Sequence, residues 1–152
     1  MNRAGPTDRL RPFGFSASTR VGFSDTDAQG IVYYGRYLPY FDLARVEYLR
    51  HLDLLKSDLG SREFVMRAST VGYHAPAVFD DMIEIFVRTS RIGRTSLTTQ
   101  LRAQRVGDDV LMCTADQTVV LIELADRRPT RIPDELRAVI RGFEGDRLEE
   151  TA

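Results

Sequence analysis

The sequence has little material for cysteine or histidine chemistry. Its 152 residues include one cysteine, Cys113, and two histidines, His51 and His74. A single cysteine excludes an intrachain disulfide and a cysteine-based zinc site. Two histidines alone cannot build a histidine-rich metal site. The residue types therefore indicate no metal centre.

The sequence also lacks an excess of charge of one sign and a long apolar run. Lysine and arginine number 21 against 22 aspartates and glutamates, a formal net charge of −1. This balance argues against a nucleic-acid partner. No apolar run approaches the ~18–20 residues that span a bilayer, and the first residues lack the apolar segment of a secretory signal. We expect a soluble, cytoplasmic protein with no membrane partner.

The composition is that of one globular domain, with 43% hydrophobic and 28% charged residues. A domain of this length buries roughly 68–70% of its unfolded surface and needs no disulfide staples. Residues 1–14 hold glycine, proline and arginine but little apolar material, so we expect a flexible N-terminal tail. The polar residues 143–152 predict a flexible C-terminal tail, which leaves residues 15–142 as the domain.

The hydrophobic pattern predicts one strand, one long helix and then four strands. Apolar and polar residues alternate over 15–23, turn-forming residues fill 25–30, and an amphipathic helix lies within 31–55, with Pro39 in its first turn. The helix prediction rests on apolar residues spaced three and four apart, at Phe41, Ala44, Tyr48, Leu52 and Leu55. The four later strands are predicted over 63–75, 81–91, 95–105 and 110–124, and a short helix from Ile132.

Tight turns between successive strands indicate antiparallel pairing. The predicted fold class is therefore α+β, a curved antiparallel sheet of about five strands wrapped around one central helix. One helix covers little of such a sheet. The uncovered flank predicts a homodimer or a homotetramer.

The segment 20–50 places two carboxylates, a Gly-Ile-Val-Tyr run and a helix with Ala-Arg-x-x-Tyr in fixed order. The matching positions are Asp25, Asp27, Gly30, Ile31, Val32, Tyr33, Tyr37 and 44–48. This pattern resembles the hotdog-fold acyl-CoA thioesterases of the 4-hydroxybenzoyl-CoA thioesterase type. Residues 73–85 and 94–103 continue the resemblance, which covers about 15–133. The family usually has asparagine before the tyrosine aligned with Tyr37, where this chain has Arg36.

The resemblance implies hydrolysis of an acyl-CoA to a carboxylic acid and coenzyme A, with no bound cofactor. Asp27 would attack the carbonyl or activate a water, and the amide of Tyr34 at the helix start would bind the carbonyl oxygen. Further substrate-binding candidates are Gly30, Ile31, Val32, Tyr33, Tyr37, Glu47 and His74. The candidates for binding the nucleotide are Arg91, Arg94, Thr95 and Ser96, with Arg127 and Arg128 as weaker ones. Sites in this family usually form between subunits, so these contacts can come from different chains.

Several of these side chains also have a structural interpretation. We interpret Asp25 as a turn or ion-pair residue, His51 as a core or surface histidine, and Cys113 as a buried, inert thiol. Glu47 is first a candidate for a buried ion pair and second for lining the site. His74 is more often structural at such a position than part of an acyl pocket.

Two further functions stay open at this point. The first is hydrolysis of an acyl group carried on acyl carrier protein. The second is a non-catalytic module that binds an acyl thioester or a protein partner, with Asp27 as a turn residue only. Dehydratases of the same fold use a histidine in a different motif, and neither histidine here lies in that context.

Overall fold

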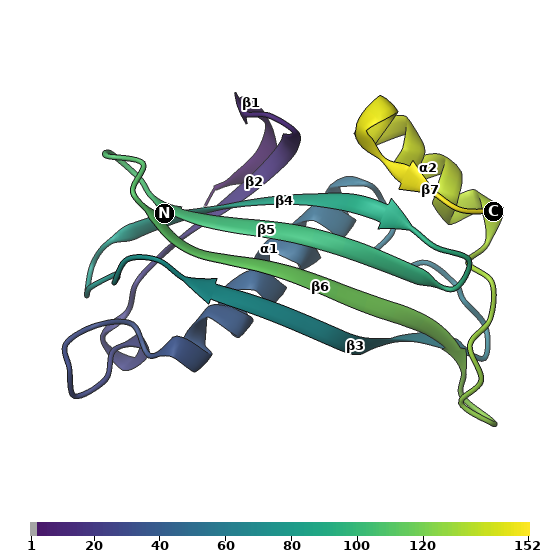
Figure 1. Cartoon of the computed structure of the whole chain (residues 1–152), viewed down its shortest axis with the longest axis horizontal. Helices are drawn as coiled ribbons and strands as arrows, with labels where there is room; N and C mark the ends of the chain where they lie inside the picture. Colours follow the sequence, from purple (N-terminus) through teal and green to yellow (C-terminus); the bar gives the residue numbers. More distant parts are fainter. Residues whose placement is uncertain (1–2) are drawn as a thin grey trace.

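The computed structural model describes residues 3–152, which form a seven-stranded sheet crossed by one long helix (Figure 1). The strand order is β1-β2-β4-β5-β6-β3, and β7 pairs with β4. The strands are β1 (Ala4–Leu10), β2 (Phe13–Arg20), β3 (Arg62–Tyr73), β4 (Met82–Ile92), β5 (Ser96–Arg105), β6 (Leu111–Glu123) and β7 (Glu149–Glu150). The α-helices are α1 (Tyr37–His51) and α2 (Asp134–Glu144).

Helix α1 lies against one face of the sheet, as the apolar spacing predicts (Figure 1). Its Phe41, Ala44 and Tyr48 are almost fully buried against β2 and β4. Pro39 occupies the first turn, where the missing amide hydrogen costs no helical bond. The α+β architecture is confirmed, and neither helix among residues 3–152 is long and apolar enough to cross a bilayer.

A polar row divides the interior into two apolar clusters. Thr89 on β4, Thr99 on β5 and Gln117 on β6 are cross-strand partners, and Ser69 on β3 pairs with Gln117. The larger cluster lies between α1 and the sheet on one side of this row. The smaller one lies on the other side, beneath α2.

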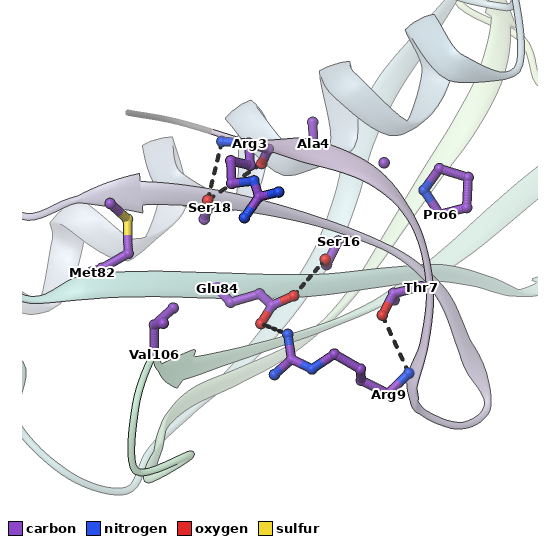
Figure 2. A pocket seen from close by; sticks show the side chains of 11 residues that line it. Arg3, Ala4, Pro6, Thr7, Arg9, Ser16, Ser18, Met82, Glu84 and Val106 are labelled. Atoms are coloured by element: carbon purple, nitrogen blue, oxygen red, sulfur yellow. Dashed lines mark hydrogen bonds and ion pairs between the residues drawn. The ribbon is translucent and has the colours of Figure 1, made fainter.

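The N-terminal residues differ from the predicted tail. Residues 4–10 form β1, which pairs antiparallel with β2, so the sheet is larger than the predicted five strands. Figure 2 shows how β1 is held: Arg9 donates to Glu84 of β4 at 2.5 Å, and Ser16 of β2 donates to the same carboxylate at 2.6 Å. Backbone pairing and this ion pair hold the segment in the sheet without alternating apolar residues.

The C-terminal residues also differ from the predicted tail. Helix α2 continues to Glu144, and β7 runs parallel to the end of β4. These contacts depend on side chains brought in from distant parts of the chain, so local composition does not report them.

The position of β3 corrects the expected succession of tight turns. This strand pairs with β6 at the sheet edge and not with β4, the next strand in sequence. The connection over 74–81 contacts the loop before α1, where the amide of Val32 donates to the carbonyl of Ala77 at 2.8 Å. The two loops thereby form one end of the molecule.

Candidate active site

The loop before α1 presents the carboxylate of Asp27. The amide of Asp27 donates to the carbonyl of Ile31, and the amide of Gly30 donates to the carbonyl of Asp27, both at 2.9 Å. Gly30 has a φ of 78°, a conformation that glycine adopts without strain. Oδ1 of Asp27 accepts the amide of Gln29 at 2.8 Å, whereas Oδ2 has no hydrogen-bond partner within residues 3–152. The half-buried carboxylate therefore keeps one oxygen available.

Asp27 faces a small pocket at the start of the helical segment. The pocket has a volume of about 290 Å³ and is lined by Ser24, Thr26, Asp27, Tyr33, Gly35, Arg36 and Pro39. Tyr34 lies between two lining residues and begins a 3-10 turn that continues into α1. In the described part of the chain, the amides of Tyr34 and Gly35 have no backbone or side-chain acceptor. Free amides at a helix start suit a developing negative charge.

Asp25 is occupied by structural contacts, as its interpretation predicts. One oxygen accepts the hydroxyl of Tyr40 at 2.7 Å and the amide of Gly22 at 2.8 Å. The other lies 3.1 Å from Nε of Arg36. Burial and this carboxylate raise the pKa of Tyr40, so the phenol stays a donor. Arg36, in place of the family's usual asparagine, fixes the helix entrance through an ion pair.

Exposed tyrosines lie beside the pocket. The rings of Tyr33 and Tyr34 are 4.5 Å apart, and Tyr73 packs edge-on against Tyr34 at 6.3 Å. The hydroxyl of Tyr73 donates to the carbonyl of Tyr34 at 3.1 Å. Sequence reasoning did not single out Tyr73, although it opens the 73–85 segment of the resemblance. Tyr37 is instead a core residue, and burial raises its pKa to about 12.

Other candidates lie outside this pocket. Ile31 is half-buried and Val32 is buried in the core. His74 is exposed, and its Nε2 lies 3.0 Å from the hydroxyl of Thr114. Glu47 pairs with Arg50 and borders a separate hollow beside β1 and β2.

Two further interpretations agree with the structure. His51 packs between Phe15 and Phe143, at ring distances of 5.4 and 5.7 Å. Cys113 is fully buried, and burial raises its pKa to about 12. The thiol is therefore protonated at neutral pH and inert. Among the described residues, no three His, Cys, Asp or Glu side chains gather as a metal site would need.

The candidates for the nucleotide lie at the opposite end of the sheet (Figure 1). Residues 93–95 form the turn between β4 and β5, with Arg91 near the end of β4 and Ser96 at the start of β5, whereas β4 begins beside the Asp27 loop. Eleven residues of strand span about 36 Å. One chain therefore does not bring Asp27 and this turn together. Arg91 and Arg94 are exposed and make no ion pair within the described chain, and the adjoining loop after β6 adds Arg127, Arg128 and Arg131.

Two further hollows have a different character. One of about 480 Å³ lies at the far end of α1 and is mostly apolar. Thr99 lines it, and its hydroxyl has no protein hydrogen-bond partner within residues 3–152. The hollow of about 370 Å³ in Figure 2 is occupied by the satisfied pair of Arg9 and Glu84.

The chain is similar to known thioesterases in sequence and in fold. Residues 21–140 match the family model of the Thioesterase-like superfamily. The acyl-CoA thioesterase YbgC of Haemophilus influenzae is 31% identical over 128 residues, which cover 82% of this chain and 93% of the relative. The acyl-CoA thioester hydrolase YbgC of Escherichia coli O6:H1 is 34% identical over 126 residues, with the same two coverages.

The fold is likewise shared with solved structures. A thioesterase superfamily protein from Jannaschia aligns with a TM-score of 0.82 at 23% identity, over 94% of both chains. Fold, family model and relatives agree over nearly the whole domain. The chain therefore belongs to the thioesterase-like superfamily and is a thioesterase with the hotdog fold.

Proposed function

We propose that the protein hydrolyses acyl-CoA thioesters to a carboxylic acid and coenzyme A. One observation carries the proposal: the Asp27 carboxylate, with a free oxygen, borders the pocket at the start of the helical segment, where two amides lack acceptors. The names of the two YbgC relatives support coenzyme A as the carrier.

The proposed chemistry uses the free carboxylate oxygen of Asp27 and the free amides at the start of the helical segment. Oδ2 of Asp27 attacks the thioester carbonyl, or removes a proton from a water that attacks it. The carbonyl oxygen gains negative charge, which the amides of Tyr34 and Gly35 stabilise. The carbon–sulfur bond then breaks, and the thiolate of coenzyme A takes up a proton, which comes from Asp27 on the water route and from solvent on the nucleophilic route. On the nucleophilic route, water next hydrolyses a mixed anhydride with Asp27, which hydroxylamine would trap.

Substrate binding is proposed to need a second copy of the chain. Gly30 and Tyr33 lie beside the reacting carbonyl, and the exposed tyrosines offer an apolar surface for the acyl group. The phosphates of coenzyme A would contact Arg91, Arg94, Thr95 and Ser96 of a partner, because one chain holds these residues far from Asp27. A homodimer or homotetramer that acts in the cytoplasm follows as a prediction. The proposed steps use only groups of the protein and water, with no bound cofactor.

The test is release of free thiol from acyl-CoAs with short, medium, long and aromatic acyl groups. Wild type is compared with Asp27→Asn, which keeps the size and removes the charge. Asp109→Asn is the matched control, because Asp109 is 67% exposed and does not line the pocket. We expect Asp27→Asn alone to lose about 10²–10⁴ in kcat.

The other outcomes separate the alternatives. If the protein cleaves acyl–acyl carrier protein but no acyl-CoA, the substrate is the thioester of the carrier protein. Binding of acyl-CoA without turnover would indicate a binding module. Full activity in Asp27→Asn would contradict the assigned residue.

A further inference from the structure

The side chain of Arg137 on α2 is charged and almost completely buried. It is only 1% exposed, the least of any charged side chain in the core. Burying a guanidinium is unfavourable unless its donors are satisfied. The hydrogen-bond acceptors of the Arg137 guanidinium therefore show which segments of the chain this side chain holds together.

The guanidinium of Arg137 joins three segments. Nη2 donates to the carbonyls of Gly93 and Arg94, at 2.7 and 3.0 Å, in the turn between β4 and β5. Nε donates to the carbonyl of Ile132 at 3.0 Å. Nη1 donates to the carbonyl of Thr151 at 2.8 Å and lies 3.3 Å from Glu150. Every nitrogen is used, and two of the acceptors belong to the turn.

Other backbone bonds fix the same turn. The amide of Gly93 donates to the carbonyl of Ser96 at 2.8 Å, and the amide of Ile132 donates to that of Arg94 at 3.0 Å. The amide of Leu121 donates to the carbonyl of Thr95 at 2.9 Å. The carbonyls of the turn are thus directed into the protein.

This orientation matters for an anion outside the turn. A carbonyl oxygen carries partial negative charge and would repel a phosphate if the peptide turned outward. With the carbonyls of Gly93 and Arg94 held by a buried cation, the outer surface offers the exposed Arg91 and Arg94 side chains. Such cations, with backbone fixed beneath them, suit phosphate oxygens.

We propose that Arg137 is a positioning residue for coenzyme A, which locks the turn between β4 and β5 in the conformation that binds the nucleotide phosphates. The inference rests on the proposed function. It assigns the C-terminal segment, α2 with β7, to substrate binding without direct contact. Glu150 supports the lock by pairing with Arg137.

The test compares two substrates that carry the same acyl group. One is the acyl-CoA and the other is the acyl thioester of N-acetylcysteamine, which has no nucleotide. In Arg137→Met we expect KM for acyl-CoA to rise about tenfold, with kcat and the kinetics on the short thioester unchanged. Arg137→Lys, which keeps the charge and some of the donors, should restore part of the affinity.

Arg141→Met is the matched control. Arg141 also pairs with Glu150 and loses the same charge, but it donates to no carbonyl of the turn. We expect its KM for acyl-CoA to match wild type. If KM for acyl-CoA rises equally in Arg141→Met, the loss of net charge is responsible, and the positioning role of Arg137 is overturned.

A folding defect is separated by a milder variant and a direct measurement. Glu150→Gln keeps Arg137 in place and should raise KM for acyl-CoA less than Arg137→Met does. Calorimetric titration with coenzyme A reports binding without turnover. If wild type hydrolyses acyl-CoA and the variants bind coenzyme A equally well, the inference fails and the proposed function stands. If wild type neither hydrolyses acyl-CoA nor binds coenzyme A, both fail.

Discussion

The two ends of the sheet differ in whether their polar groups have hydrogen-bond partners. At the Asp27 end, one carboxylate oxygen and two backbone amides have no partner within the described chain, and they border the same pocket. At the Arg137 end, every nitrogen of a buried guanidinium is used to hold backbone carbonyls and a carboxylate. Unpaired groups can act on a substrate, whereas paired groups fix the backbone that carries other contacts.

The contrast also exists within the Asp27 loop. Asp25 and Asp27 are two residues apart, yet Asp25 accepts two hydrogen bonds and an ion pair, and Asp27 accepts one amide. Similar residue types in one motif thus serve stability and chemistry separately. The predictions below test this division.

The largest effect is expected at Asp27. Asp27→Asn should lower kcat by about 10²–10⁴ while the free energy of unfolding changes by less than about 0.5 kcal/mol. The reason is that the free oxygen makes no stabilising contact, and an Asn oxygen can still accept the Gln29 amide. Thiol-release kinetics and urea unfolding measure the two quantities. A large loss of stability in Asp27→Asn would show that Asp27, like Asp25, stabilises the fold, which contradicts the proposed difference between the two residues.

The matched change at Asp25 should act mainly on stability. Asp25→Ala leaves the hydroxyl of Tyr40 and the guanidinium of Arg36 without their shared partner. We expect a loss of about 1–3 kcal/mol in the free energy of unfolding. Urea denaturation is the measurement, with Asp116→Ala as the control, because Asp116 is exposed and makes no side-chain hydrogen bond or ion pair within residues 3–152. A stability equal to wild type would show that these contacts contribute nothing net.

At the Arg137 end, Glu150 and Glu144 should make the free energy of unfolding depend on pH in opposite directions. Arg141 and Arg137 lower the pKa of Glu150 to about 2, from 4.5. The contribution of ionised Glu150 to the stability of the folded protein is therefore present above about pH 4.5 and is lost as the pH falls towards 2. Burial raises the pKa of Glu144 above 4.5, so its contribution is present below that pH and is lost as the pH rises through the shifted value.

Urea unfolding from pH 2 to pH 8 measures both effects. Glu150→Gln should flatten the acid side of the stability profile. Glu144→Gln should flatten the decline at higher pH, since its amide oxygen can still accept from Tyr48 and from the amide of Thr89. If either variant keeps the wild-type profile, that carboxyl is not the group responsible.

The smallest effect is expected at Thr99, an unpaired group outside both ends. Thr99→Val removes a hydroxyl that lines the apolar hollow and has no protein partner within residues 3–152, and it should change the free energy of unfolding by less than about 0.5 kcal/mol. Thermal unfolding measures the change, and Thr89→Val, whose hydroxyl lies 2.9 Å from that of Tyr48, should instead destabilise. Destabilisation by Thr99→Val would indicate that the hydroxyl is satisfied by ordered water.

The local elements were predictable because their pattern is local. Spacing of three and four placed α1 close to its observed 37–51, and alternation placed β2 and the four later strands within a few residues. The Asp27 loop was also predictable, since its turn residues and the following helix are contiguous. By contrast, β1 lacks alternating apolar residues, so its pairing with β2 was missed.

The sequence by itself determined α1, the strands from β2 to β6, the α+β class and the loop that presents Asp27, because each depends on neighbours within a few residues. Only the tertiary structure decided that β3 pairs with β6, that Glu47 and residues 91–96 lie away from Asp27, and that Arg137 is buried. These features depend on contacts between residues 40 or more positions apart, such as Arg137 with Gly93. Such contacts form only when the sheet closes around the helix, and no local pattern encodes their partners.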